Sequence, residues 1–188
     1  VMNSPVVLAV PANSPYNTLE DFIEAAKAKE LSVSNSGAAS AFAATAYTLG
    51  KMTGAKITPV PFDGGAPAVA AALGNHVDAV TAGAGETATP FADGTLKVLA
   101  IFSDEPHARF EGVKTAAEQG YDLSFGAWGG IYGPAGIPDD VKAILEASIK
   151  KAAASQTFLD AVTPAGILPT YKSGDEWKAF VDAEAARY

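Results

Sequence analysis

Apolar residues in the first hundred positions form short continuous runs that alternate with helical stripes. Residues 5–11 are apolar throughout, with a proline at each end, which is typical of a buried strand. Thr18 and Asp21 have the spacing of a capping box and so predict the start of a helix. Behind them, apolar side chains recur at the spacing of a core-facing helix: Leu19, Phe22, Ile23 and Ala26. The chain is therefore expected to open with a strand and an amphipathic helix.

The same alternation continues to about residue 101. Strands are predicted at residues 31–34, 57–61, 77–81 and 96–101, and helices at residues 38–52, at 67–73 and just before Asp93. Gly54 and Gly74 are expected to end the first two of these helices. Strands that alternate with helices of this length predict βαβ units, with a parallel sheet and helices on both of its faces. The predicted fold class is α/β.

The pattern changes after Tyr121. Residues 123–132 form a glycine-laced aromatic run that predicts a long strand, in which Trp128 and Tyr132 either pack in a core or stack on a ligand. Three helix-like segments follow, without a further predicted strand. Apolar residues mark them: Val141, Ile144, Leu145 and Ile149, then Phe158 and Leu159, then Trp177, Phe180 and Val181. We therefore expect a first domain at residues 1–126 and a helical extension at residues 127–188 that packs elsewhere.

Charge and composition limit the classes of partner. The 188 residues carry a formal net charge of −8, and the 13 Lys and Arg residues are scattered, which argues against a nucleic-acid partner. The absence of cysteine excludes disulfides, thiol nucleophiles and thiolate metal sites. No apolar run approaches the length of about 18 residues that predicts a membrane span. Because the chain starts almost directly in a strand pattern, we expect a mature or truncated fragment.

Three loops lie where ligands bind in open parallel sheets, which is beyond the carboxyl ends of the strands. They are residues 34–40, 62–66 and 81–86, and they are rich in Gly, Ala, Ser and Thr. Large side chains are few in them, so backbone amides stay accessible. Together the loops predict one wall of a polar cleft.

The first of these loops, Ser36-Gly37-Ala38-Ala39-Ser40, is the most informative. Its small side chains leave N–H groups bare at a helix N-terminus, which captures a carboxylate without a cationic side chain. It lacks the Gly-Lys-Ser/Thr ending of a phosphate P-loop. Helix capping by Ser34, Asn35 or Ser36 explains the same residues without a ligand, so both interpretations stay open.

Groups for enzyme chemistry are sparse. His76 follows a predicted helix end and His107 lies in a polar loop, where histidines are typically caps or surface residues. Metal-ligand spacings, a nucleophile elbow and a complete dinucleotide fingerprint are missing from the sequence, which predicts no catalytic residue, no metal and no cofactor. An enzyme would have to use Glu86, His76 or Asp63 as its base, although the position of Glu86 is more typical of a residue that caps the following helix. The loops therefore favour binding over catalysis.

Five segments together resemble the Bug-type solute-binding proteins, the extracytoplasmic receptors of tripartite tricarboxylate transporters. They are PVVLAVPANSPYNTLEDFIEAAKA, LSVSNSGAASAFAATAYTLGKMTG, ITPVPFDGGAPAVAAALGNHVDAV, DGTLKVLAIFSDE and WGGIYGPAGIPDDVKAILEASIKKA. The resemblance spans Val6 to Phe180, which is nearly the whole chain. The order and spacing of the segments carry it, more than any single motif.

The resemblance implies a two-lobed periplasmic-binding-protein fold of type II, with a carboxylated ligand between the lobes. Residues 1–126 would be the second lobe, and residues 127–188 the hinge strand and helical C-terminal segment of the first lobe, whose N-terminal part is absent. It also implies a periplasmic or extracytoplasmic receptor, not an enzyme, that captures a small organic acid and delivers it to membrane transporter subunits. An enzyme or an effector-sensing domain on a related α/β scaffold is the alternative.

The resemblance also implies a set of ligand-binding residues. The family's carboxylate loop corresponds to the 36–40 run, its tyrosine-lysine-glycine turn to Phe62-Asp63-Gly64, and its aspartate-asparagine loop to Ala82-Gly83. The expected ligand-binding residues are Ser36, Gly37, Ala38, Ala39, Ser40, Asp63, Gly64, Gly65, Thr81, Ala82 and Gly83. The last two turns depart from the family, and Asp63 in place of a lysine removes a cation from the expected cleft. The resemblance therefore leaves the identity of the acid open.

Overall fold

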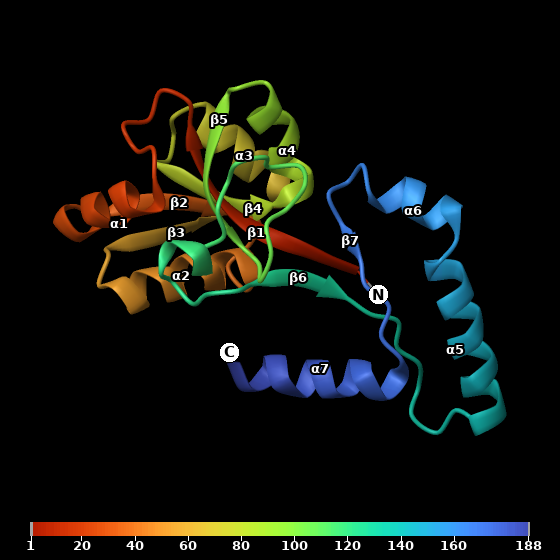
Figure 1. Cartoon of the computed structure of the whole chain (residues 1–188). Helices are drawn as coiled ribbons and strands as arrows, with labels where there is room; N and C mark the ends of the chain where they lie inside the picture. Colours follow the sequence, from red (N-terminus) through yellow and green to blue (C-terminus); the bar gives the residue numbers. More distant parts are fainter. Residues whose placement is uncertain (1, 188) are drawn as a thin grey trace. The chain divides into compact units, whose positions relative to one another are not determined.

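The computed structural model describes residues 2–187, so Val1, with which the expected first domain begins, lies outside the described residues. The chain forms two compact units (Figure 1). Ser4–Ala127 is the sheet unit, and residues 2–3 with residues 128–187 are the C-terminal unit. The chain passes between the units within a strand at residues 3–4 and again at residues 127–128.

The sheet unit alternates strands and helices as the pattern predicts. Its strands are β1 (Met2–Pro11, whose first two residues belong to the C-terminal unit), β2 (Leu31–Asn35), β3 (Ile57–Pro61), β4 (Ala79–Gly83) and β5 (Leu96–Phe102). Its helices are α1 (Leu19–Ala28), α2 (Ala41–Thr53), α3 (Gly65–Leu73), α4 (Ala84–Ala92) and the short 3-10 helix η1 (Ala117–Gln119). The α/β class is confirmed.

The sheet has the order β3-β2-β4-β1-β5, and its strand directions are mixed. β2 runs parallel to β3 and to β4, as predicted. In this order β1 lies between β4 and β5 and runs antiparallel to each, so the expectation of a parallel sheet is wrong at this strand. An apolar run such as residues 5–11 reports burial on both faces, and burial does not specify the direction of the neighbouring strands.

Two hydrophobic cores cover the two faces of the sheet, and β1 contributes to both. Val6, Leu8 and Val10 pack with the buried residues of α1 and α2, whereas Val7 and Ala9 pack with those of α3 and α4. These five side chains are at most 1% exposed. Alternate residues of a strand point to opposite faces, so β1 is an interior strand that is covered on both faces.

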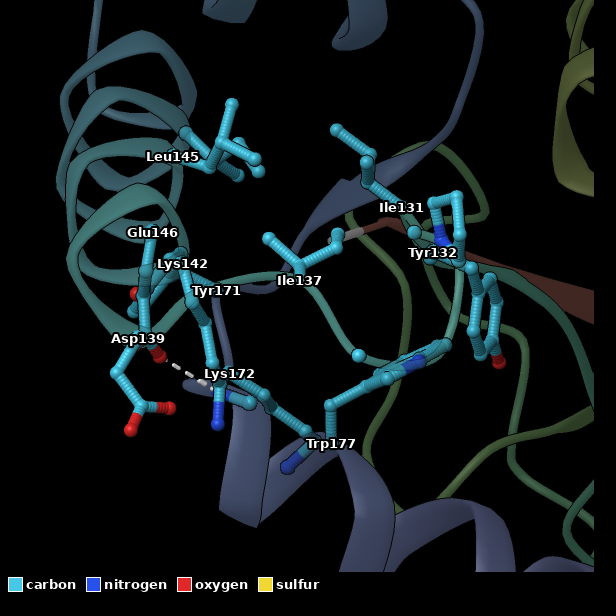
Figure 2. Close-up of a pocket in the computed structure, with 16 residues that line it drawn as sticks. Ile131, Tyr132, Ile137, Asp139, Lys142, Leu145, Glu146, Tyr171, Lys172 and Trp177 are labelled. Carbon is cyan, nitrogen blue, oxygen red and sulfur yellow. Dashed lines mark hydrogen bonds between the residues drawn. The ribbon is translucent and has the colours of Figure 1, made fainter.

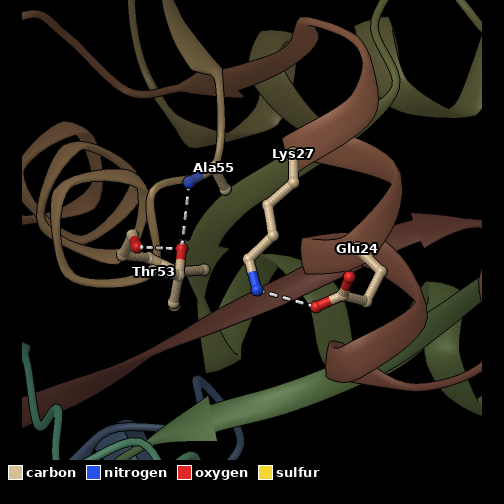
Figure 3. A network of polar contacts seen from close by, with 5 residues as sticks. Glu24, Lys27, Thr53 and Ala55 are labelled. Atoms are coloured by element: carbon tan, nitrogen blue, oxygen red, sulfur yellow. Dashed lines mark hydrogen bonds and ion pairs between the residues drawn. The ribbon is translucent and has the colours of Figure 1, made fainter.

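Local signals at helix ends act as the sequence predicts. The Asp21 N–H donates to Thr18 Oγ1, and the Thr18 N–H donates to the Asp21 carboxylate, both at 3.0 Å, which completes the capping box of α1. At the C-terminal end of α2, Gly54 ends the helix with φ at 71°, a left-handed conformation that favours glycine. Figure 3 shows this end, where the Ala55 N–H donates to Thr53 Oγ1, together with the exposed Glu24–Lys27 ion pair of α1.

The C-terminal unit contains α5 (Asp139–Ala153), α6 (Gln156–Val162) and α7 (Gly174–Arg187), the three predicted helices. The predicted long strand is shorter, because β6 spans Gly126–Gly129 alone. A two-residue strand that the pattern did not predict, β7 (Leu168–Pro169), pairs with Met2 and Asn3. The Trp128 ring lies 5.5 Å from the rings of Trp177 and Phe180 in edge-on contacts, so it packs among aromatic residues of this unit.

Candidate ligand-binding site

The carboxyl ends of β2, β3 and β4 bring the three predicted loops to one edge of the sheet. The Phe62 N–H donates to the Asn35 carbonyl at 2.8 Å, which joins the loop after β3 to the end of β2. The Thr81 hydroxyl lies 3.4 Å from the Ser34 carbonyl and joins β4 to β2. Because these strands are parallel neighbours, the N-termini of α2, α3 and α4 follow them at the same edge.

Asn35, which precedes the 36–40 loop and is fully buried, stabilises this loop by a hydrogen bond. Asn35 Oδ1 accepts the Gly37 N–H at 3.1 Å, and Gly37 has φ at 132°, a conformation that side chains rarely adopt. Ser36 and Gly37 are half-buried, whereas Ala38 and Ala39 are exposed. The loop therefore presents backbone and methyl groups to solvent.

Ser40 is the N-cap of α2, so this helix begins three residues later than predicted. Its hydroxyl accepts the Ala43 N–H at 3.2 Å and donates to the Gly37 carbonyl at 2.7 Å. Capping therefore occurs, but Ser40 performs it in place of the three residues that the sequence suggested. The next two N–H groups, those of Ala41 and Phe42, belong to the first helical turn and have no acceptor within the helix.

The 62–66 loop starts α3 at Gly65, two residues earlier than predicted. Gly64 is the N-cap, has φ at 115° and offers no side chain to cap the helix. Asp63 is exposed in the turn before it. The loop thus leaves the first amides of α3 without a cap from its own residues.

Glu86 lies in the first turn of α4, and its carboxylate is close to Gly65 of the 62–66 loop and to Gly83 of the 81–86 loop. A Cβ atom on Gly65 would lie 2.7 Å from Glu86 Oε1, and one on Gly83 would lie 2.6 Å from Glu86 Oε2 and 2.8 Å from Ser4 Oγ. These two glycines therefore make the space that the carboxylate occupies. Sequence reasoning treated Glu86 as the base of an alternative enzyme, and the glycines on each side are the signal that could have placed it here.

The remaining predicted residues lie deeper in the sheet. Thr81, Ala82 and Gly83 are buried residues of β4. The Thr81 and Ala82 side chains are at most 1% exposed. The structure thus brings the three loops together, but the accessible part consists of the 36–40 run, residues 62–66, Gly85 and Glu86.

The two histidines lie outside this group of loops. His76 is exposed beyond the C-terminal end of α3, whereas the loops gather at its N-terminal end. His107 is buried, and its Nδ1 accepts the Arg109 N–H at 3.2 Å. Within residues 2–187, no three His, Cys, Asp or Glu side chains stand close enough together to hold a metal ion. The helices of this part of the chain also include none with the length and apolarity of a membrane span.

Sequence reasoning missed a cavity of about 490 Å³ within the C-terminal unit (Figure 2). Ile131, Tyr132, Leu145 and Trp177 supply apolar walls, and Lys142 lines it on α5. Ile131 and Tyr132 are 64% and 67% exposed, so Tyr132 belongs to no core of the described residues. The available signal is the glycine-laced run at residues 123–132, which includes Ile131 and Tyr132 and which the pattern alone predicts to be a long strand.

The sheet unit gathers helix N-termini at the carboxyl edge of its parallel strands, which is where open α/β sheets bind ligands. The tripartite tricarboxylate transporter family receptor (TctC) matches residues 1–188, and the chain belongs to this family.

Several members of the family are similar to this chain in sequence or in structure. Protein BugT of Bordetella pertussis is 28% identical over 189 residues, which cover 98% of this chain and 57% of BugT. The crystal structure of a ligand-free TctC solute-binding protein from Polaromonas is 34% identical with a TM-score of 0.84, and the match covers 99% of this chain and 65% of that one. MatC of Rhodopseudomonas palustris, solved with bound malate, is 25% identical with a TM-score of 0.86, and the match covers 99% of this chain and 65% of MatC. The chain thus spans less than two thirds of each of these proteins.

Proposed function

We propose that this chain acts as the ligand-binding part of an extracytoplasmic, periplasmic receptor that captures a small carboxylate and delivers it to a membrane transporter. Membership of the receptor family and the malate bound to MatC support the substrate class. The observation that carries the proposal is the 36–40 loop, whose exposed alanines precede the Ala41 and Phe42 amides, which have no acceptor within α2. A carboxylate placed there meets N–H donors and the positive end of the helix dipole.

The proposal assigns the chemistry to binding, not to catalysis. The alternative enzyme needs a base, and Glu86, His76 and Asp63 are its candidates. His76 lies at the opposite end of α3 from the loops, and both carboxylates are exposed. Receptors of this family are solute-binding proteins, and the geometry of the loops supports the same role.

The proposal also assigns the two units to two lobes. The sheet unit would be the second lobe, and the C-terminal unit would be the segment that completes the first lobe. The exposed apolar residues of the C-terminal unit support this assignment, since Ile131, Ile144 and Leu145 are 64%, 65% and 47% exposed. Apolar residues that are exposed together on one part of a soluble protein can mark a contact with further polypeptide.

Backbone NMR of the 188-residue chain tests the binding site. We expect malate, butyrate or 4-aminobutyrate to shift the amide signals of residues 36–42 more than those of the rest of the chain. Ala39→Asp places a negative charge beside these amides and should weaken binding by about tenfold or more. Ala70→Asp is the matched control, because it adds the same charge at an exposed position of α3.

Two outcomes would contradict the proposal. Shifts that spread over the molecule without residues 36–42 would remove this loop from the site. Equal binding by the Ala39→Asp and Ala70→Asp variants would show that the α2 amides do not hold the carboxylate.

A further inference from the structure

Glu86 places a negative charge inside the candidate site, and within residues 2–187 this carboxylate has no recorded ion-pair partner. Its carboxylate lies against Gly65 and Gly83, beside Ser4 Oγ. Across residues 2–187, the structure records no hydrogen bond or ion pair of the Glu86 side chain. The side chain is exposed, so a bound molecule can reach it.

The three loops contain no cation that could balance this charge. Among residues 34–40, 62–66 and 81–86, the charged side chains are Asp63 and Glu86, and both are acidic. Glu86 lies at the N-termini of α3 and α4, which are the positions that a ligand carboxylate would otherwise favour. A second ligand carboxylate at this end of the site would face the like charge of Glu86.

The end of the site at α2 has the opposite character. The first turn of α2 contains no acidic residue. Asn35, which supports the 36–40 loop, is fully buried, and its Nδ2 donor has no hydrogen-bond partner among the described residues. Because a buried donor without a partner is unfavourable, it points to an acceptor that the protein itself does not supply.

The two ends therefore differ in the charge that they accept. We propose that Glu86 makes this site select ligands that carry one carboxylate and a separate ammonium group over ligands that carry two carboxylates. The carboxylate lies at the amides of α2, and the ammonium group faces the Glu86 carboxylate. The inference rests on the proposed function, and it narrows the substrate class from small carboxylates to amino acids with separated charges.

Matched pairs of compounds on the 188-residue chain test the inference. 4-Aminobutyrate is compared with succinate, and 6-aminohexanoate with adipate, so that each pair differs in the terminal group and not in the length of the chain. The dissociation constants come from NMR titration of residues 36–42. We expect the amino acid of at least one pair to bind about fivefold more tightly than the matching dicarboxylate, the range of a partly exposed charge pair.

Two isosteric variants separate the local charge from the net charge. Glu86→Gln should bring the ratio within each pair close to one, with the larger change in the affinity for the dicarboxylate. Glu111→Gln is the control, because it removes the same charge from an exposed position outside the three loops and should keep the ratio. Both variants reduce the negative charge of the chain by one, so a different result for the two assigns the effect to position.

Each result decides a different claim. If the dicarboxylates bind as tightly as the amino acids in the unmodified chain, or if Glu86→Gln leaves the ratio unchanged, the inference is wrong while the proposed function stands. If no compound shifts residues 36–42, the proposed function fails and the inference fails with it.

Discussion

Helices α1 and α5 carry similar apolar stripes but have different surroundings. The four apolar residues of the α1 stripe are at most 1% exposed. No residue of α5 is buried, and Ile144 on this helix is 65% exposed. The comparison teaches that a periodic pattern predicts a helix and its apolar face, whereas burial depends on what other chain is present to cover that face.

The largest expected difference comes from removing the same side chain in both helices. Ile23→Ala in α1 opens a cavity in a packed core and should lower the free energy of unfolding by about 2–5 kcal/mol. Ile144→Ala in α5 removes a side chain that is already in water and should change it by about 0.5 kcal/mol or less. Urea unfolding followed by circular dichroism measures both. Equal losses would show that Ile144 is covered in solution.

A smaller effect is expected at the start of α1. Thr18→Ala removes the hydroxyl that accepts the Asp21 N–H, and should lower the free energy of unfolding by about 1 kcal/mol. Thr89→Ala on α4 is the matched control, since Thr89 is exposed and its hydroxyl forms no hydrogen bond recorded within the described part of the chain. The same urea titrations measure both variants. A stable Thr18→Ala variant would mean that packing alone determines where α1 begins.

The smallest effect depends on pH and sharpens the comparison, because it should occur in both units. The Asn17 N–H, followed by the Thr18 N–H and hydroxyl, lowers the pKa of Asp21, and the Ser173 N–H lowers that of Glu176. Each lowered pKa adds stability above the unfolded-chain pKa near 4, and this stability is lost as the pH falls through the lower folded value. Carboxyl NMR titration should show both values below the ordinary range.

Two amide variants serve as tests of this linkage. Asp21→Asn and Glu176→Gln should each reduce the dependence of stability on pH on the acid side and leave the alkaline side unchanged. A carboxyl pKa in the ordinary range would show that the N–H donors of that helix start do not hold the carboxylate in solution.

Structural features that depend on residues close together in the chain could be predicted from the sequence. The capping box at Thr18, the stop at Gly54 and the α/β alternation are confirmed because each depends on neighbours a few residues away. The observed ends of strands and helices differ from the predicted ends by up to three residues. At α2, for example, Ser40 is the N-cap, and the helix begins at Ala41. The grouping of the three loops also followed, since β2, β3 and β4 are parallel neighbours.

Long-range features could not be predicted in the same way. The antiparallel course of β1 depends on which strands become its neighbours, and its apolar run is compatible with either direction. The place of Glu86 between Gly65 and Gly83 requires β3 and β4 to bring two distant loops together. The cavity of the C-terminal unit likewise comes from segments that are about forty residues apart, such as Ile131 and Tyr171.

By itself, the sequence determined the helices, the strands, the apolar faces and the small-residue loop that leaves amides accessible, because these follow from local sterics and from side-chain periodicity. The tertiary structure alone decided the direction of β1, the deep burial of Thr81 and Ala82, and the negative end of the candidate site at Glu86. The physical reason is that strand pairing and helix packing select among many partners that are equally compatible with the local pattern. The position of the Glu86 charge in the candidate site is one result of that strand pairing and helix packing.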